Sequence, residues 1–138
     1  MNKGPVLIII NEEWEREIYT SIWEDLEYEN SLKLFDNAEE ALSFIAEEET
    51  RPFLIISDVK LPGINGYEFR EKLLHDADLK CKTVPFIFRS TIDSEEAIER
   101  AHAAAANGYF VKGADINGMR KNITAIIEYW KLSRVPRG

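Results

Sequence analysis

The sequence contains few of the residues that cross-link a chain, and it has no long apolar segment. There is one cysteine, Cys81, among 138 residues. A lone cysteine excludes an internal disulfide framework, which is typical of secreted domains. No apolar run approaches the roughly 18 to 20 residues that cross a bilayer, and the N-terminal residues lead into an acidic stretch rather than a signal peptide. We therefore expect a cytoplasmic protein with no membrane partner.

Positive charge is also scarce. Lys and Arg number 17 against 25 Asp and Glu, which gives a formal net charge of −8. Because nucleic acids present negative phosphates, we expect no nucleic-acid partner for a chain with this balance and no basic stripe. A length of 138 residues with 45% hydrophobic residues fits one soluble domain. We expect residues 1–138 to form this domain, with a core over about residues 5–131 and a frayed C-terminal tail.

Short apolar runs alternate with amphipathic segments along the chain. The runs predict buried strands at residues 6–10, 32–35, 53–57, 84–88 and 109–111. Helical patterns follow, including an apolar stripe at Ile18, Tyr19, Ile22, Trp23 and Leu26, a capping box from Asp93 to Glu96, and a last helix capped by Asp115. Strands alternating with helices predict an α/β fold with a parallel sheet and helices on both faces.

Polar residues follow most of the predicted strands. They are Asn11 and Glu12 after the first strand, Asp58 after the third, Ser90 and Thr91 after the fourth, and Lys112 after the fifth. Because ligands bind beyond the carboxyl ends of parallel strands, we expect these side chains at one edge of the sheet. A carboxylate nucleophile, with a hydroxyl and an ammonium to stabilise oxygens, could accept a phosphoryl group there, and a divalent cation would help.

Three segments resemble the receiver domains of bacterial two-component response regulators. Residues 58–66 match the run Asp-x-x-x-Pro-x-x-x-Gly, residues 85–90 resemble the fourth strand with its switch Ser or Thr, and residues 108–112 resemble the fifth strand with its aromatic residue and lysine. The resemblance covers about residues 5–131. It implies a doubly wound, flavodoxin-like fold with five parallel strands in the order 2-1-3-4-5, and helices one and five on one face.

The resemblance also implies a signalling function rather than a classical enzyme. Asp58 would accept a phosphoryl group from a histidine kinase or phosphotransfer protein. The phosphoryl-contacting or switch residues would be Ser90, Thr91, Tyr109 and Lys112. Mg²⁺ would bind Asp58 and the backbone carbonyl of Lys60. An unknown downstream protein would read the switch, with a homodimer possible through helix four, strand five and helix five.

The metal-binding segment departs from this family, which carries two adjacent acids after the first strand. The apolar stripe of the first helix fits the family when Ile10 and Asn11 occupy the acid positions, with Glu12 one residue beyond. Asn11 and Glu12 are then the remaining candidate ligands, and Mg²⁺ should bind weakly because it prefers anionic oxygens. Gly113 stands where the family has proline, and Arg89 ends a strand that should be apolar, where it could reach the sheet edge or pair with an acid.

Two other readings stay open. The chain could be a degenerate receiver that binds partners independently of phosphorylation, which Ile10, Asn11 and Gly113 favour. More distantly, it could be a haloacid-dehalogenase-like phosphatase, although no Asp-x-Asp follows a strand. The acids of the first helix are expected to form its solvated face; they are Glu13, Glu15, Glu17, Glu24, Asp25 and Glu27.

Overall fold

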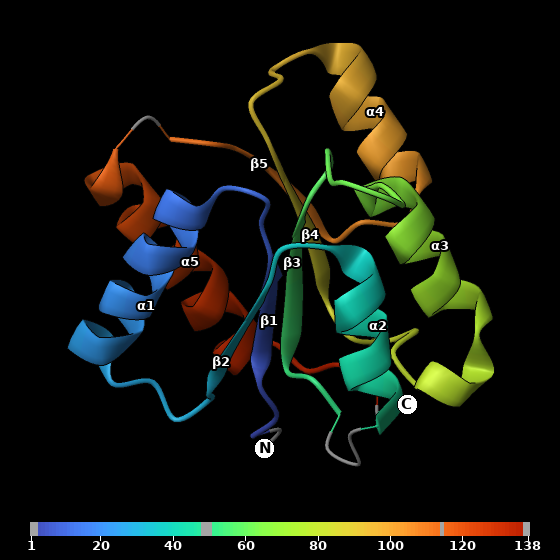
Figure 1. Cartoon of the computed structure of the whole chain (residues 1–138), viewed down its shortest axis with the longest axis horizontal. Helices are drawn as coiled ribbons and strands as arrows, with labels where there is room; N and C mark the ends of the chain where they lie inside the picture. Colours follow the sequence, from blue (N-terminus) through green and yellow to red (C-terminus); the bar gives the residue numbers. More distant parts are fainter. Residues whose placement is uncertain (1–2, 48–50, 114, 137–138) are drawn as a thin grey trace.

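The computed structural model describes residues 3–47, 51–113 and 115–136, which form a parallel sheet between two layers of helices (Figure 1). The strands are β1 (Val6–Ile9), β2 (Leu32–Phe35), β3 (Leu54–Asp58), β4 (Phe86–Ser90) and β5 (Gly108–Val111). They pair in parallel in the order β2-β1-β3-β4-β5. The predicted fold class and strand order are confirmed.

The helices divide between the two faces of this sheet. They are α1 (Glu13–Leu26), α2 (Ala38–Glu47), α3 (Gly66–His75), α4 (Glu95–Ala103) and α5 (Ile116–Leu132), with a short 3-10 helix η1 (Ala77–Leu79) after α3. Helices α1 and α5 cover one face, and α2, α3 and α4 cover the other (Figure 1). Alternate residues of β1 point to opposite sides, so Val6 and Ile8 pack in the α1–α5 core while Leu7 and Ile9 pack in the other.

The helix starts follow the cap residues of the sequence, with one correction. The Asp115 side chain accepts a 2.8 Å hydrogen bond from the Gly118 backbone N–H, as predicted. The predicted cap at Asp93 is wrong, because Ser94 is the cap of α4 and accepts a 3.2 Å bond from the Ala97 backbone N–H. Ser94 has the extended backbone typical of an N-cap, so the helix begins one residue later than expected.

Strand β4 lies two residues further along the chain than the apolar run at 84–88 predicted. Its register pairs Ile55 with Phe86 and Asp58 with Arg89. Ser90 is therefore the last residue of the strand rather than the first residue after it, and Arg89 lies beside Asp58. Among the described residues, no helix is both long and apolar enough to span a membrane.

Candidate functional site

Asp58 and Lys112 meet at the carboxyl edge of the sheet. Asp58 ends β3, and Lys112 follows β5, two strands away. The Lys112 Nζ lies 3.0 Å from the Asp58 Oδ2. Asp58 is only 2% exposed, so its carboxylate lies below the surface of the edge.

The loop after β3 packs closely on Asp58 because it contains Gly66. A Cβ atom at this position would lie 2.4 Å from the Asp58 backbone oxygen, a distance that real Cβ atoms do not show. The Gly66 N–H donates to the Val59 carbonyl at 2.9 Å, and Asn65 caps α3 with a capping box. The Asp-to-Gly spacing noted in the sequence therefore fixes the turn that follows the acid.

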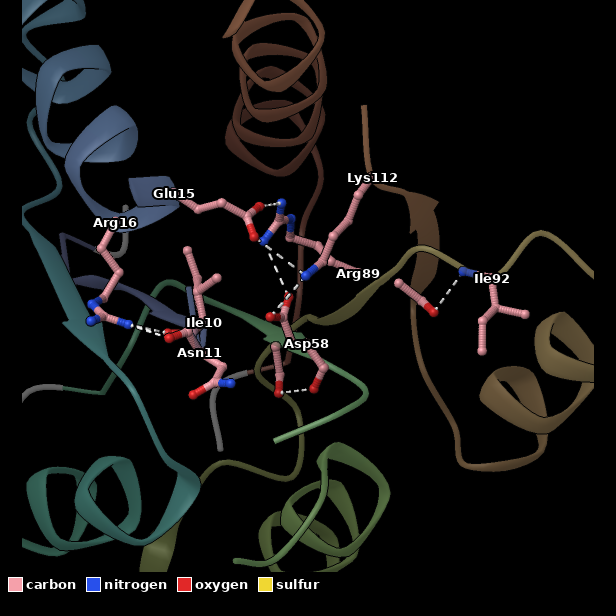
Figure 2. A network of polar contacts seen from close by, with 10 residues as sticks. Ile10, Asn11, Glu15, Arg16, Asp58, Arg89, Ile92 and Lys112 are labelled. Carbon is pink, nitrogen blue, oxygen red and sulfur yellow. Dashed lines mark hydrogen bonds and ion pairs between the residues drawn. The ribbon is translucent and has the colours of Figure 1, made fainter. Parts of the chain in front are cut away.

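Arg89 and Glu15 complete a buried group of charges with Asp58 and Lys112. The Arg89 Nη1 lies 3.1 Å from the Asp58 Oδ1, and its Nη2 lies 2.5 Å from the Glu15 Oε2. Lys112 Nζ also lies 3.4 Å from the Glu15 Oε1. Figure 2 shows Glu15 reaching from α1 to Arg89, with Asp58 contacting both cations. We call these four residues the charge network.

The expectation that Glu15 belongs to the solvated face of α1 is wrong. Glu15 is only 3% exposed, whereas the neighbouring Glu13 and Glu17 are exposed. Glu15 precedes Tyr19 by four positions and Ile22 by seven, so it shares the buried stripe of the helix. This spacing could have indicated in the sequence that Glu15 is buried. Arg89 was a second signal, because an arginine within a buried strand needs an acidic partner.

Burial and charge act against each other on these groups. Burial raises the pKa of Asp58 above its usual value, Arg89 and Lys112 lower it in part, and Glu15 raises it. For Arg89, burial works to lower the pKa, but Tyr19, Asp58 and Glu15 together hold it above the usual value. The Arg89 guanidinium also lies 5.4 Å from the centre of the Tyr19 ring. Arg89 therefore stays charged inside the protein.

The candidate switch residues hold the loop between β4 and α4. The Ser90 hydroxyl accepts a 3.0 Å hydrogen bond from the Ile92 N–H, and the Tyr109 hydroxyl donates to the Ile92 carbonyl at 2.7 Å. Thr91 is exposed. Ser90 lies at the same edge as Asp58, but its hydroxyl is engaged with its own loop.

The segment after β1 holds two of the candidate metal ligands, Asn11 and Glu12. Ile10 is fully buried in the apolar core, and the side chains of Asn11 and Glu12 are exposed. The backbone oxygens of Ile10 and Asn11 instead accept hydrogen bonds of 2.7 and 2.9 Å from Arg16 Nη1 (Figure 2). In the part of the chain that the structure describes, no three acidic, histidine or cysteine side chains group to hold a metal ion.

The comparisons with known proteins identify the family of the chain. The family model for the response regulator receiver domain matches residues 6–124. The chain belongs to this family. It is 30% identical over 123 residues to the response regulator GacA of Pseudomonas protegens, covering 88% of this chain and 54% of that protein. The chain thus spans about half the length of such curated relatives. Receiver-domain response regulators are signalling proteins rather than classical enzymes.

Solved structures of receivers share the fold. The phosphorylated cyanobacterial phytochrome response regulator RcpA superposes with a TM-score of 0.84 at 20% identity, covering 99% of both chains. The receiver domain of the sensor histidine kinase PA1611 from Pseudomonas aeruginosa PAO1 superposes with a TM-score of 0.76 at 18% identity, covering 96% of this chain and 100% of that one. That receiver holds a magnesium ion in its active-site cleft.

The pocket of this chain does not fit such an ion. Both oxygens of Asp58 contact cationic side chains, and in the register expected from the sequence the buried apolar Ile10 takes the position of one family acid. Mg²⁺ needs several hard oxygen ligands and does not replace them with apolar groups.

Proposed function

We propose that this chain is a signalling receiver that works by binding partner proteins, with Asp58 held by internal ion pairs rather than set by Mg²⁺-dependent phosphorylation. The observation that carries the proposal is the state of Asp58, which is 2% exposed and has one oxygen on Arg89 and the other on Lys112. A nucleophile must approach its target atom to about 3–3.5 Å. Here both oxygens face cations, and weak Mg²⁺ binding follows from the same contacts.

The partner surface in this proposal is formed by α4, β5 and α5. Five large apolar side chains are exposed there or in the loops beside it: Ile92 (55%), Val111 (38%), Ile116 (54%), Tyr129 (58%) and Leu132 (83%). Ser90 and Tyr109 hold Ile92 through its backbone, and Ser90 follows Arg89 in the chain. The charge network is therefore linked to this surface through Ser90, which is adjacent to Arg89 in the chain and hydrogen-bonded to Ile92. A histidine kinase, a phosphotransfer protein, a downstream protein or a second copy of the chain would bind there.

A second candidate function is phosphoryl acceptance at Asp58, and the contact with Lys112 favours it. An ammonium 3.0 Å from the carboxylate can neutralise a phosphoryl oxygen, and Ser90 and Thr91 lie at the neighbouring strand end. The phosphoryl group would pass from a phosphohistidine of the partner to an Asp58 oxygen. Arg89 would first have to release that oxygen or turn toward the incoming group.

Intact-mass spectrometry after incubation with acetyl phosphate and Mg²⁺ separates the two functions. We expect the mass of the wild-type chain to stay unchanged, under conditions in which a receiver with both family acids gains one phosphoryl group. Asp58→Asn is the matched control. A phosphoryl adduct on the wild type that is lost in this variant contradicts the proposal and establishes the second candidate.

A further inference from the structure

The central feature of the pocket is a cation that lies between two carboxylates. The Arg89 guanidinium contacts Asp58 through one terminal nitrogen and Glu15 through the other (Figure 2). The side chains of Arg89, Asp58 and Glu15 are 6%, 4% and 4% exposed. Such a fork of donors suits a buried carboxylate pair better than a lysine does, because its planar geometry is fixed.

The two carboxylates come from different elements and converge on the same charges. Glu15 belongs to the first turn of α1, and Asp58 ends β3. Both also contact the Lys112 ammonium, at 3.4 and 3.0 Å. The two acids therefore share the same two cations. With two acids, one guanidinium and one ammonium, the formal charge of the network is zero without any metal.

The end of β1 is also adapted to cationic side chains. Arg16 Nη1 binds the carbonyl oxygens of Ile10 and Asn11, so these backbone acceptors are already engaged. A divalent ion at this edge would meet three positive side chains and would lack the two carboxylates that the family supplies after its first strand. Close charges of the same sign repel one another strongly near a protein surface, so such repulsion excludes a weakly held ion.

We propose that the Arg89 guanidinium is a resident cation beside Asp58, in the role that a divalent metal has in other receivers, and that its removal exposes a latent divalent-cation site at Asp58 and Glu15. The cation is covalently attached, so the state of Asp58 does not depend on the concentration of Mg²⁺. Glu15 supplies from α1 the negative charge that the residues after β1 no longer provide. The inference concerns the cation alone and stands under either candidate function.

Binding of Mn²⁺ and Mg²⁺ to wild type and Arg89→Gln tests the inference. Mn²⁺ binding is followed by electron paramagnetic resonance, and Mg²⁺ binding by thermal unfolding. We expect no saturable binding to the wild type at millimolar metal, and binding to Arg89→Gln that is at least about tenfold tighter, which corresponds to about 1.4 kcal/mol. The Mg²⁺-dependent rise in melting temperature should appear only in the variant. Acetyl phosphate labelling is a separate readout, so failure here and failure of the proposed function are distinguishable.

Two controls assign the site to the named residues. Arg89→Lys keeps a cation and should bind metal no better than the wild type, while Glu15→Gln combined with Arg89→Gln should lose the binding gained by the single variant. If Arg89→Gln is unfolded without metal, Mg²⁺ or Mn²⁺ should restore its far-ultraviolet circular dichroism. The inference is overturned if the wild type binds Mg²⁺ as tightly as Arg89→Gln. It is equally overturned if Arg89→Gln gains no binding when folded, or is not restored by metal when unfolded.

Discussion

Two buried arginines, Arg89 and Arg70, show how differently one protein can accommodate the same charge. Arg89 is 5% exposed on β4 and faces the α1 side of the sheet, whereas Arg70 is 4% exposed on α3 in the opposite layer. Arg89 contacts two carboxylates. In the part of the chain that is described, Arg70 donates only to the Ala105 carbonyl, at 2.7 Å, and its Nε and Nη1 lack hydrogen-bond partners.

The contrast extends to the charge state of each group. Burial lowers the pKa of Arg70 to about 10, because among the described residues no carboxylate offsets it and only Cys81 raises the value. The same burial acts on Arg89, but its anionic neighbours reverse the direction. The Arg70 guanidinium lies 5.0 Å from the centre of the Phe86 ring and donates to the Ala105 carbonyl just after α4. Arg70 therefore packs against the ring and holds the C-terminal end of this helix. Arg89 instead determines the electrostatics of the pocket.

The largest expected effect comes from removing the cation of the charge network. Arg89→Met leaves Asp58 and Glu15 buried with Lys112 as their single shared cation. Breaking a buried ion pair from one side typically costs about 3–5 kcal/mol, because an uncompensated charge remains inside. We expect a loss of this size in the free energy of unfolding, measured by urea denaturation at neutral pH. A loss below about 1 kcal/mol, the level of an exposed ion pair, would show that water or a shift of Lys112 compensates the two acids.

The sequence predicted the fold and half of this network. Alternating apolar runs gave the parallel sheet, and the motifs around Asp58 and Lys112 brought these two residues to one edge, now 3.0 Å apart. The other half was missed because Glu15 belongs to no motif and is 74 positions from Arg89. Arg89 lies in the segment 85–90, but the sequence predicted only that it could reach the sheet edge or pair with an acid, without naming that acid. Glu15 was counted with its acidic neighbours, although its helical spacing placed it on the buried stripe. Only the register of β4 against β3 shows that Arg89 lies beside Asp58.

Neutralising Asp58 should affect stability in the opposite direction. Because its pKa in the folded protein is raised, the folded state disfavours the ionised carboxylate relative to the unfolded chain. Asp58→Asn is therefore expected to be at least as stable as the wild type at pH 7, with Arg89 still paired to Glu15. As the pH falls through the raised pKa, the wild type takes up a proton in its folded state and the advantage of the variant shrinks. Urea denaturation at several pH values between 4 and 8 measures this, since unperturbed Asp titrates near about 3.9. If the stability advantage of Asp58→Asn over the wild type grew as the pH fell, the pKa of Asp58 would be lowered in the folded protein rather than raised.

Arg70→Met, the matching substitution on the other face of the sheet, should change the free energy of unfolding little. Arg70→Met removes one hydrogen bond to Ala105 and one ring contact, but it also removes two buried donors without partners. Replacing a buried charge by an apolar side chain of similar volume is often neutral or stabilising. We expect the free energy of unfolding to stay within about 1.5 kcal/mol of the wild type, as for other volume-conserving changes. A loss equal to that of Arg89→Met would mean that burial alone, rather than the carboxylate partners, sets the cost of removing an arginine.

The smallest effect on stability is expected at the exposed ion pair between Arg120 and Asp25. Arg120 Nη2 lies 2.7 Å from Asp25 Oδ2, which is shorter than the 3.1 Å contact between Arg89 and Asp58, but these side chains are 38% and 61% exposed. Exposed pairs contribute about 0.2–1 kcal/mol because water screens the charges and ordering the side chains costs entropy. Arg120→Gln, with Asp25→Asn and the double variant to complete a cycle, should give a coupling free energy at the low end of that range. High salt should reduce it further, while the coupling between Glu15 and Arg89 should persist. Equal coupling at both pairs would show that distance rather than burial governs the strength of charge pairing in this receiver.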